Sequence, residues 1–249
     1  MQKNTHKTAL ITGAARRIGA EIATLLHSAE INVVIHYNTS KKEAEELCAT
    51  LNKKRAHSAV TLQADLNDTT QCTKLIHDSI QSWGYLDILI NSASRFYKAS
   101  VGDVTESIWE DLINSNLRAP FFLSQAAAGE LAKQQGCIVN IADIHAERPM
   151  RDYAVYCISK AGLVMMTKSL AKQLAPAVRV NAISPGEIIW PEGDNVLSDE
   201  EKNKILKKIS LTRIGSPIEI AKTVLFLIRD ASYITGQVIT VDGGRSLGS

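Results

Sequence analysis

Asp143, Tyr156 and Lys160 are the residues whose types and spacing suggest chemistry. Residues 137–142 are apolar and β-branched, which predicts a buried strand ending at Asp143. Tyr156 and Lys160 lie four residues apart in a stretch typical of a helix, so their side chains share one face. A carboxyl group at the end of a strand, facing a Tyr–Lys pair on the next helix, predicts a site that holds and transfers protons.

The composition is that of an ordinary globular protein, with 249 residues of which 45% are hydrophobic and 22% charged. A formal net charge of +2 gives no electrostatic case for binding nucleic acid or a membrane. No apolar run approaches the ~18 residues of a membrane span, and the first residues contain no apolar signal segment. The four cysteines lack CxxC or His/Cys spacing, which predicts reduced, buried thiols and no metal site. We therefore expect a cytoplasmic protein that acts on a small molecule.

Strands and helices alternate along the chain. Strands are predicted over residues 8–12, 33–36, 58–63, 86–91, 137–142, 178–184 and 237–241, and helices over 16–28, 40–52, 68–83, 105–134, 153–174, 198–208 and 217–230. This order predicts a Rossmann-type α/β fold, a doubly wound parallel β-sheet flanked by helices on both faces. Ser40 followed by Glu43 predicts a capping box on the second helix. No linker or repeat divides residues 1–249, so a single domain is expected.

The first strand-to-helix junction carries the pattern of a dinucleotide-binding loop. Residues 12–19 read T-G-A-A-R-R-I-G, where Gly13 allows a tight turn and Gly19 allows the helix to pack closely. A pyrophosphate would lie over the helix N-terminus, where free N–H groups and the helix dipole favour anions. Arg17 stands where such loops often have a glycine, and a turn without a ligand is the alternative interpretation. The residues expected to contact the cofactor here are Gly13, Arg16, Arg17, Ile18 and Gly19.

The end of the second strand favours NADPH over NADH. An NAD site usually has an acid about 20 residues after the glycines, which binds the ribose 2′-hydroxyl. Residues 36–40 read H-Y-N-T-S, so a 2′-phosphate would meet no repulsion. A second Y-x-x-x-K match, at residues 37–41, lies at this adenosine end, far from any nicotinamide. The residues expected at the adenosine phosphate are His36, Tyr37, Asn38 and Ser40, together with Arg16 or Arg17.

Taken together, these motifs resemble the short-chain dehydrogenase/reductase family in their order and spacing. The resemblance covers the chain from about Lys7 to its end and rests on Thr12-Gly13 with Gly19, Asp65-Leu66, Asn91-Ser92-Ala93, Asn116, Tyr156 with Lys160, Pro185-Gly186 and Asp242-Gly243-Gly244. It implies that Asp65 and Leu66 flank the adenine and that Asn91 and Ala93 lie along the cofactor. It also implies that Pro185 and Gly186 lie beside the nicotinamide.

The same resemblance implies roles for the proton-handling residues. Lys160 would hold the nicotinamide ribose, and Asn116 would help order a relay water against the Lys160 backbone. A phenol has a pKa of about 10, so Tyr156 is a proton donor at neutral pH, and Lys160 with an oxidised nicotinamide would favour its phenolate. A proton from Tyr156 and a hydride from the nicotinamide reduce a C=O or C=N bond. Members of the family are usually homotetramers, which would bury residues 105–134, 153–174 and the last strand.

Asp143 departs from the wider family. Thirteen residues before the catalytic tyrosine, most relatives have a serine that binds a substrate carbonyl. A carboxylate there would repel a developing alkoxide, whereas a carboxyl group that shares a proton with Tyr156 suits protonation of a basic ring nitrogen. The alternative is a structural role, as a helix cap or as an ion-pair partner of Arg148 or Arg151.

With this aspartate the chain resembles the pteridine reductases in particular. Residues 91–97, N-S-A-S-R-F-Y, and 233–244, Y-I-T-G-Q-V-I-T-V-D-G-G, support the resemblance. It implies that Phe96 stacks on a pterin, sandwiched against the nicotinamide, and that residues from about 187 to 209 form a substrate loop. The expected substrate-binding residues are Arg17, Ser94, Phe96, Asp143, Tyr156 and Trp190, of which Ser94 and Arg17 also contact the cofactor phosphates.

The sequence therefore predicts an NADPH-dependent pteridine reductase that reduces a C=N bond of a dihydropterin. Two alternatives stay open. An NADPH-dependent ketoreductase, such as a 3-oxoacyl-[acyl-carrier-protein] reductase, is disfavoured by Asp143. A catalytically silent dinucleotide-binding sensor is disfavoured by the intact set of Asn116, Tyr156 and Lys160.

Overall fold

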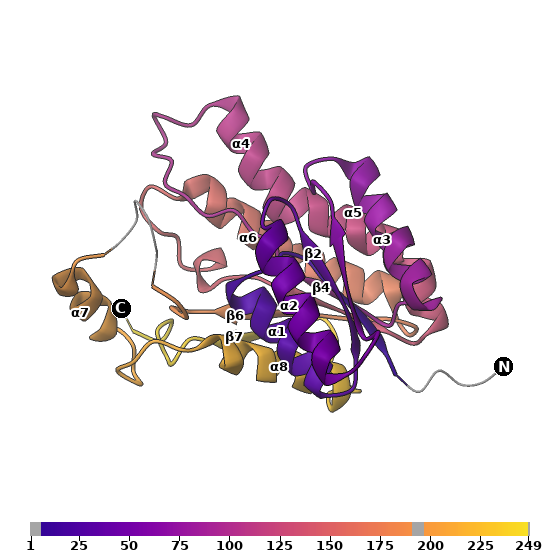
Figure 1. The fold of residues 1–249 in the computed structure, drawn as a ribbon. Helices are drawn as coiled ribbons and strands as arrows, with labels where there is room; N and C mark the ends of the chain where they lie inside the picture. Colours follow the sequence, from indigo (N-terminus) through magenta and orange to yellow (C-terminus); the bar gives the residue numbers. More distant parts are fainter. Residues whose placement is uncertain (1–5, 191–196, 249) are drawn as a thin grey trace.

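A parallel sheet of seven strands forms the centre of the computed structural model, which describes residues 6–190 and 197–248. The strands are β1 (Thr8–Ile11), β2 (Asn32–Tyr37), β3 (Ala59–Gln63), β4 (Ile88–Asn91), β5 (Cys137–Ile141), β6 (Arg179–Pro185) and β7 (Val238–Val241). Their order in the sheet is β3-β2-β1-β4-β5-β6-β7, with every neighbouring pair parallel. Figure 1 shows the strands between the helices.

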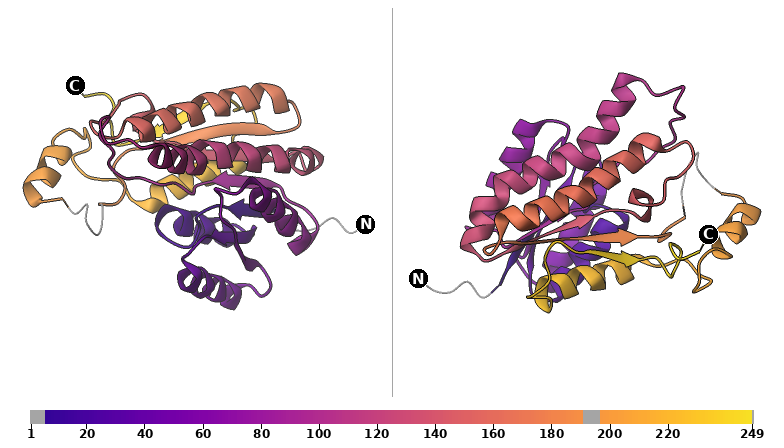
Figure 2. Two further views of the ribbon diagram at one scale, coloured as in Figure 1. Left: turned by 90° about the horizontal axis from the view of Figure 1, so that it is seen from above. Right: turned by 180° about the vertical axis from the view of Figure 1, so that it is seen from behind.

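Helices cover both faces of the sheet (Figure 2). One face carries α1 (Arg17–Ser28), α2 (Lys41–Lys54) and α8 (Pro217–Arg229). The other carries α3 (Thr69–Trp83), α5 (Ala119–Lys133) and α6 (Ala154–Leu174). α4 (Glu106–Ile113) packs against α6, and α7 (Asp199–Leu206) lies beyond the end of the sheet. The predicted doubly wound, Rossmann-type α/β fold is confirmed.

The strands are apolar on both sides because helices bury both faces. In β1, Ala9 and Ile11 belong to the core under α1 and α8, whereas Leu10 belongs to the core under α3 and α5. The same alternation places Ile88 and Ile90 of β4 on the first face and Leu89 on the second. This packing holds the loops at the carboxyl ends of the strands in fixed positions.

The predicted helix over residues 105–134 is not one regular helix. α4 is followed by a π-helical turn, η1 (Asn114–Arg118), and only then by α5. A π-helical turn accommodates an extra residue in the helix and is frequent at functional sites. The buried side chain of Asn116 lies in this turn, and its hydrogen bonds are described below.

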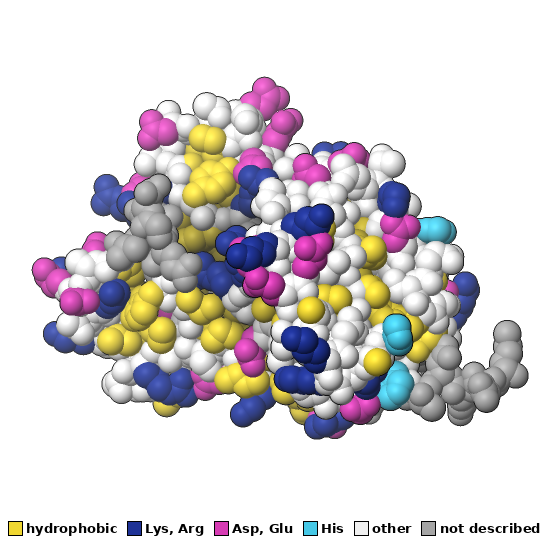
Figure 3. Space-filling view, in the orientation of Figure 1, with side chains coloured by type: hydrophobic (Ala, Val, Ile, Leu, Met, Phe, Trp, Pro, Cys, Tyr) yellow, Lys and Arg dark blue, Asp and Glu magenta, His cyan; other side chains and the backbone are white. Residues whose placement is uncertain are grey.

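The predicted capping box at the start of α2 is wrong. Ser40 is the N-cap of α2, but its side chain makes no capping hydrogen bond. The Glu43 carboxylate lies instead 3.7 Å from a guanidinium nitrogen of Arg16, the N-cap residue of α1. Figure 3 shows Lys and Arg side chains beside Asp and Glu side chains over these two helices.

All four cysteines are free thiols, with Cys72, Cys137 and Cys157 buried and Cys48 half-buried. Over residues 6–190 and 197–248, no three His, Cys, Asp or Glu side chains come together as metal ligands would. Across the same residues, no helix has the length and apolar character needed to cross a membrane.

Candidate active site

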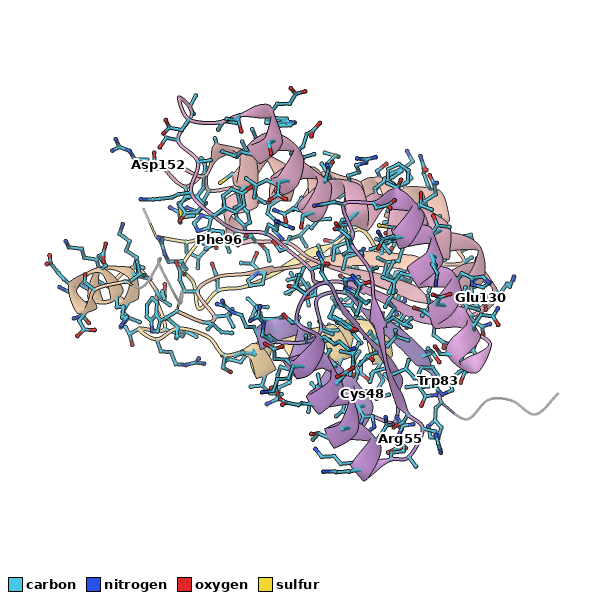
Figure 4. All side chains as sticks on the ribbon, turned by 45° about the horizontal axis from the view of Figure 1, so that its top comes forward. Cys48, Arg55, Trp83, Phe96, Glu130 and Asp152 are labelled. Atoms are coloured by element: carbon cyan, nitrogen blue, oxygen red, sulfur yellow. The ribbon has the colours of Figure 1, made fainter. Side chains whose placement is uncertain are left out.

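The carboxyl ends of the strands converge beside the point where the chain changes direction in the sheet. β1 lies between β2 and β4, so successive crossovers leave it on opposite sides. In this kind of fold, ligands bind outside the carboxyl ends of the strands at that point. Gly13 after β1, Asp143 after β5 and Gly186 after β6 all lie at this edge. Figure 4 shows Phe96 at the same end of the molecule, away from Trp83.

Two glycines shape the loop after β1 because the backbone passes too close to its neighbours for a side chain. Gly13 has a φ of 64°, and a Cβ there would lie 2.9 Å from the Cα of Ala93. A Cβ on Gly19 would overlap the carbonyl oxygen of Gly13. α1 begins here without a side-chain cap and without an acidic residue in its first turn. Its N-terminal N–H groups and dipole therefore suit a phosphate.

Arg17 is held in an uncommon backbone conformation. Its φ of 54° lies in the left-handed region, which favours glycine and costs other residues free energy. The side chain is exposed at the first position of α1, while the neighbouring Ile18 packs on the core. Arg17 therefore places an exposed guanidinium group at the start of α1, where the sequence predicted a contact with the cofactor.

The sequence suggested that His36 offers a cation to the 2′-phosphate. In the structure, His36 supports the loop after β1 instead. Its buried ring accepts a hydrogen bond from the Gly13 N–H at Nδ1, at 3.1 Å, and its Nε2 lies 3.1 Å from the Ala64 carbonyl oxygen. Burial lowers the pKa of His36 to about 4, so the ring is neutral at pH 7, with its proton on Nε2. The imidazole therefore ties the Gly13 loop to the segment after β3.

The other residues predicted at the adenosine end lie after β2 and β3, at the same edge. Tyr37 closes β2 and is half-buried, and Asn38 accepts a hydrogen bond from the Gln63 side chain. Beyond β3, Asp65 accepts the Asn67 N–H at 3.0 Å. Ser40 is the N-cap residue of α2, but its side chain makes no capping hydrogen bond. Leu66 is buried.

Asn91, predicted along the cofactor, and Pro185 and Gly186, predicted beside the nicotinamide, lie at the carboxyl ends of β4 and β6. The Asn91 amide points inward and donates to the Asn140 side chain at 2.8 Å. Its buried Oδ1 has no hydrogen-bond partner among the described residues. Pro185 ends β6, and a Cβ on Gly186 would lie 2.6 Å from the Cβ of Asp242. Gly186 is therefore required for the close approach of the chain segments that follow β6 and β7.

Asp143 and Tyr156 form a direct hydrogen bond. The Tyr156 hydroxyl donates to Asp143 Oδ2 at 2.6 Å, while Asp143 Oδ1 accepts the His145 N–H at 2.8 Å and caps a short 3-10 turn. Oδ2 thus makes the contact with Tyr156 that proton sharing would need, while Oδ1 makes the capping bond of the structural alternative. Arg148 donates instead to backbone carbonyls near the C-terminus, so it is not the ion-pair partner that the sequence allowed.

Burial dominates the electrostatics of Tyr156 and Lys160. Burial, and then the Asp143 carboxylate, raise the pKa of the Tyr156 phenol well above its usual value. Lys160 is 2% exposed, donates to the Ile141 carbonyl at 3.0 Å, and has its pKa lowered to about 8 by burial. Burial and the carboxylate both favour the neutral phenol, so Tyr156 keeps its proton at neutral pH. The effect expected of Lys160 together with an oxidised nicotinamide stays a prediction for the protein with its cofactor.

The Asn116 side chain binds the loop after β4, and the relay water that the family resemblance implies for this residue stays a prediction. Its Oδ1 accepts hydrogen bonds from the Ser94 hydroxyl at 3.1 Å and from the Arg95 N–H at 2.8 Å. Its Nδ2 donates to the Arg95 carbonyl at 3.0 Å and to the Ser159 hydroxyl at 3.1 Å. Ser159 in turn donates to the Tyr156 carbonyl at 2.6 Å, so the amide links this loop to α6.

Phe96 lies against the proton-handling pair. Its ring is 43% exposed, stacks on Tyr153 with ring centres 4.7 Å apart, and meets Tyr156 edge-on at 4.9 Å. The sequence reasoning missed Tyr153, although its position three residues before Tyr156 is a spacing that brings side chains to one face of a helix. Trp190 is half-buried, and residues 191–196 of the predicted substrate loop lie outside the described residues.

Comparisons with known proteins agree with this site. A family model described as enoyl-(acyl carrier protein) reductase matches residues 13–246. The chain is 37% identical to pteridine reductase 1 of Leishmania tarentolae over 284 aligned residues, covering 98% of this chain and 97% of the relative. It is also 37% identical to a 3-oxoacyl-[acyl-carrier-protein] reductase of Staphylococcus aureus over 241 residues, covering 96% and 97%. It is 32% identical to glucose 1-dehydrogenase 2 of Bacillus subtilis over 248 residues, covering 98% and 96%.

The names of these relatives differ in substrate, and two of them are equally similar to this chain. Each relative matches this chain over nearly its full length. The chain itself has a doubly wound sheet with a Tyr–Lys pair at its carboxyl edge. The protein is therefore an oxidoreductase that belongs to the short-chain dehydrogenase/reductase family.

Proposed function

We propose that the protein is an NADPH-dependent pteridine reductase that reduces a C=N bond of a dihydropterin to give the tetrahydropterin. The observation that carries the proposal is the 2.6 Å hydrogen bond from the Tyr156 hydroxyl to Asp143. This bond places a carboxyl group beside the proton donor. At that position, a carbonyl reducer needs a neutral group that donates a hydrogen bond to the substrate oxygen.

Electrostatics favour a ring nitrogen over a carbonyl as the proton acceptor. Reduction of a ketone passes through a developing alkoxide, and an alkoxide bound by Tyr156 would lie close to the Asp143 carboxylate. Two like charges about 4 Å apart at an effective dielectric of about 20 repel by about 4 kcal/mol. Protonation of an imine nitrogen during hydride transfer creates no anion on the substrate, and the negative charge that the proton leaves behind stays on the Asp143–Tyr156 pair. The pair Asp143–Tyr156 then acts as one unit that holds and delivers a single proton.

The residues at the strand ends fit a dinucleotide. The Gly13 loop passes close to Ala93, α1 starts without a cap, and the buried Asn91 Oδ1 is left without a partner among the described residues. Residues 36–40 contain no acid to repel a 2′-phosphate, and Arg17 is exposed at the start of α1. When bound, NADPH supplies the hydride. The N-terminus of α1 and Arg17 would hold its phosphates, and Lys160 would hold the nicotinamide ribose.

The aromatic side chains fit a planar substrate. Phe96 is exposed at the proton-handling pair, and aromatic rings stack favourably on flat heterocycles. We further infer a homotetramer, which would cover the exposed apolar side chains on α4, α5 and α6, including Trp109, Phe121 and Met165. Sedimentation velocity tests this assembly, and a monomer would contradict it.

The proposed function is tested by following NADPH oxidation with dihydrobiopterin, with an acetoacetyl thioester, and with no second substrate. We expect turnover with dihydrobiopterin and a kcat/KM for NADPH at least about tenfold above that for NADH, a difference of about 1.4 kcal/mol. Turnover of the thioester alone would instead support the ketoreductase alternative. An equal kcat/KM for the two cofactors would remove the preference for NADPH.

A further inference from the structure

Phe96 lies between two residues that are both bound by the same carboxylate. Asp111 on α4 pairs with the Arg95 guanidinium at 3.0 Å through Oδ1, and its Oδ2 accepts the Tyr97 hydroxyl at 2.9 Å. Arg95 and Tyr97 therefore face α4, while the ring of Phe96 faces Tyr153 on the other side. Alternation of side chains along an extended segment accounts for this arrangement.

The backbone of the same segment is fixed by a separate anchor. Asn116 binds both the N–H and the carbonyl of Arg95, the residue immediately before Phe96. Asn116 belongs to η1, which continues directly from α4. α4 also packs against α6, the helix that carries Tyr156. Packed helices therefore connect Asp111 to the proton-handling pair.

The Tyr97 hydroxyl stays a hydrogen-bond donor to Asp111 at neutral pH. Burial first, and then the hydrogen bond to Asp111, raise the pKa of Tyr97 to about 12. The phenol thus remains a donor. The side chain of Asp111 is 24% exposed, less than the 45% of Arg95, so water competes with its bonds only in part.

We propose that Asp111 is a positioning residue for Phe96: by holding Arg95 and Tyr97, it fixes the orientation of the Phe96 ring and thereby sets the affinity of the site for a flat aromatic substrate. Asp111 does not touch the substrate in this arrangement. The identity of the substrate as a pterin rests on the proposed function, whereas the orientation of the ring does not.

The orientation is measured without any substrate. The chain has four phenylalanines, so ring-labelled phenylalanine gives a simple carbon–proton spectrum in which Phe96→Leu identifies the signal of Phe96. The rings of Tyr153 and Tyr156 shift that signal. We expect Asp111→Asn to move it toward the value of an unpacked ring, Tyr97→Phe to move it in the same direction by less, and Glu110→Gln, an exposed change on the same helix, to leave it in place. An unshifted Phe96 signal in folded Asp111→Asn and Tyr97→Phe would overturn the proposal.

Measurements of binding distinguish a positioning role of Asp111 from a merely structural one. In the parent protein, Asp111→Asn should raise the Kd of a planar diaminopteridine and the KM for dihydrobiopterin about threefold to tenfold, the range expected for the loss of one hydrogen bond. The Kd of NADPH should stay within about twofold, since the Phe96 ring is expected to contact the substrate and not the cofactor. In a Phe96→Ala background, Asp111→Asn should add no further loss, because residues that act through one another are not additive.

A further loss in the Phe96→Ala background, as large as that in the parent, would overturn the proposal. A wild-type protein that binds no pterin would refute the proposed function alone, because the spectrum of Phe96 still decides the role of Asp111.

Discussion

Replacing Lys160 with methionine is expected to make the protein more stable at neutral pH while abolishing its activity. Lys160 is 2% exposed, and its Nζ donates to the Ile141 carbonyl at 3.0 Å. Methionine fills a similar volume without a charge, and replacing a buried charged group by an apolar one of similar size is often stabilising. The change removes the ammonium that we propose to hold the nicotinamide ribose.

The magnitude follows from the pKa of the lysine. A pKa lowered from 10.5 to about 8 means that burial disfavours the charged form by about 3 kcal/mol, at ~1.4 kcal/mol per pKa unit. Loss of the bond to Ile141 costs about 1 kcal/mol. At pH 7 the free energy of unfolding of Lys160→Met should therefore exceed that of wild type by about 2 kcal/mol.

The pH dependence has a definite sign. Between pH 8 and 10.5 the unfolded chain binds a proton on Lys160 that the folded chain does not, so this residue makes wild-type stability rise with pH. The advantage of Lys160→Met should accordingly shrink to about zero near pH 9.5. Urea unfolding at several pH values measures it, with Lys168→Met, an exposed change on α6, as the control. If Lys160→Met is less stable than wild type at pH 7 while Lys168→Met is unchanged, the reasoning about the buried ammonium is refuted.

Three further outcomes are expected from the site. Arg17→Gly should relieve the backbone strain at φ 54°, raise the free energy of unfolding by about 0.5–1 kcal/mol, and raise the KM for NADPH; an unchanged KM would exclude the guanidinium from the cofactor site. As the pH falls from 6.5 to about 4, the unfolded chain takes up a proton that the buried His36 ring does not, so wild type should lose stability that His36→Gln keeps. Parallel urea titrations test this, and equal slopes would contradict it. Phe96→Ala should weaken binding of a diaminopteridine, measured by calorimetry with NADPH present, by about 1–3 kcal/mol, and an unchanged affinity would remove Phe96 from the site.

Much of the fold was predictable because its signals are local. The strands are covered on both faces, so each appears in the sequence as a short apolar run, and their observed bounds differ from the predicted ones by two residues at most. Gly13 and Gly19 were identifiable because only glycine satisfies the close backbone contacts that the loop makes. The contact between Asp143 and Tyr156 followed from placing one residue after a strand and the other on the next helix.

The features that were not predictable depend on partners far away in the sequence. His36 binds Gly13 and Ala64, and the pattern of β2 does not reveal that both ring nitrogens are occupied. Glu43 lies near Arg16 and does not complete the capping box with Ser40, and the local sequence of α2 does not reveal this neighbour.

Tertiary contacts also decide the roles of Asn116 and Asp111. The Asn116 side chain binds Ser94, Arg95 and Ser159, and its position in the sequence did not reveal these contacts. The role of Asp111 had no signal in the sequence, since an acid on a predicted helix is most often a solvated side chain.

The most direct test of the account is the ratio of kcat/KM for dihydrobiopterin to that for an acetoacetyl thioester, measured with NADPH for wild type and for Asp143→Ser. The account predicts that wild type favours the pterin. It also predicts that Asp143→Ser loses about 100-fold or more of its pterin activity, the scale of a lost proton-transfer group, and gains activity on the ketone. Full pterin activity in Asp143→Ser, or a wild type that reduces only the thioester, would contradict the claim that the Asp143–Tyr156 pair protonates a ring nitrogen.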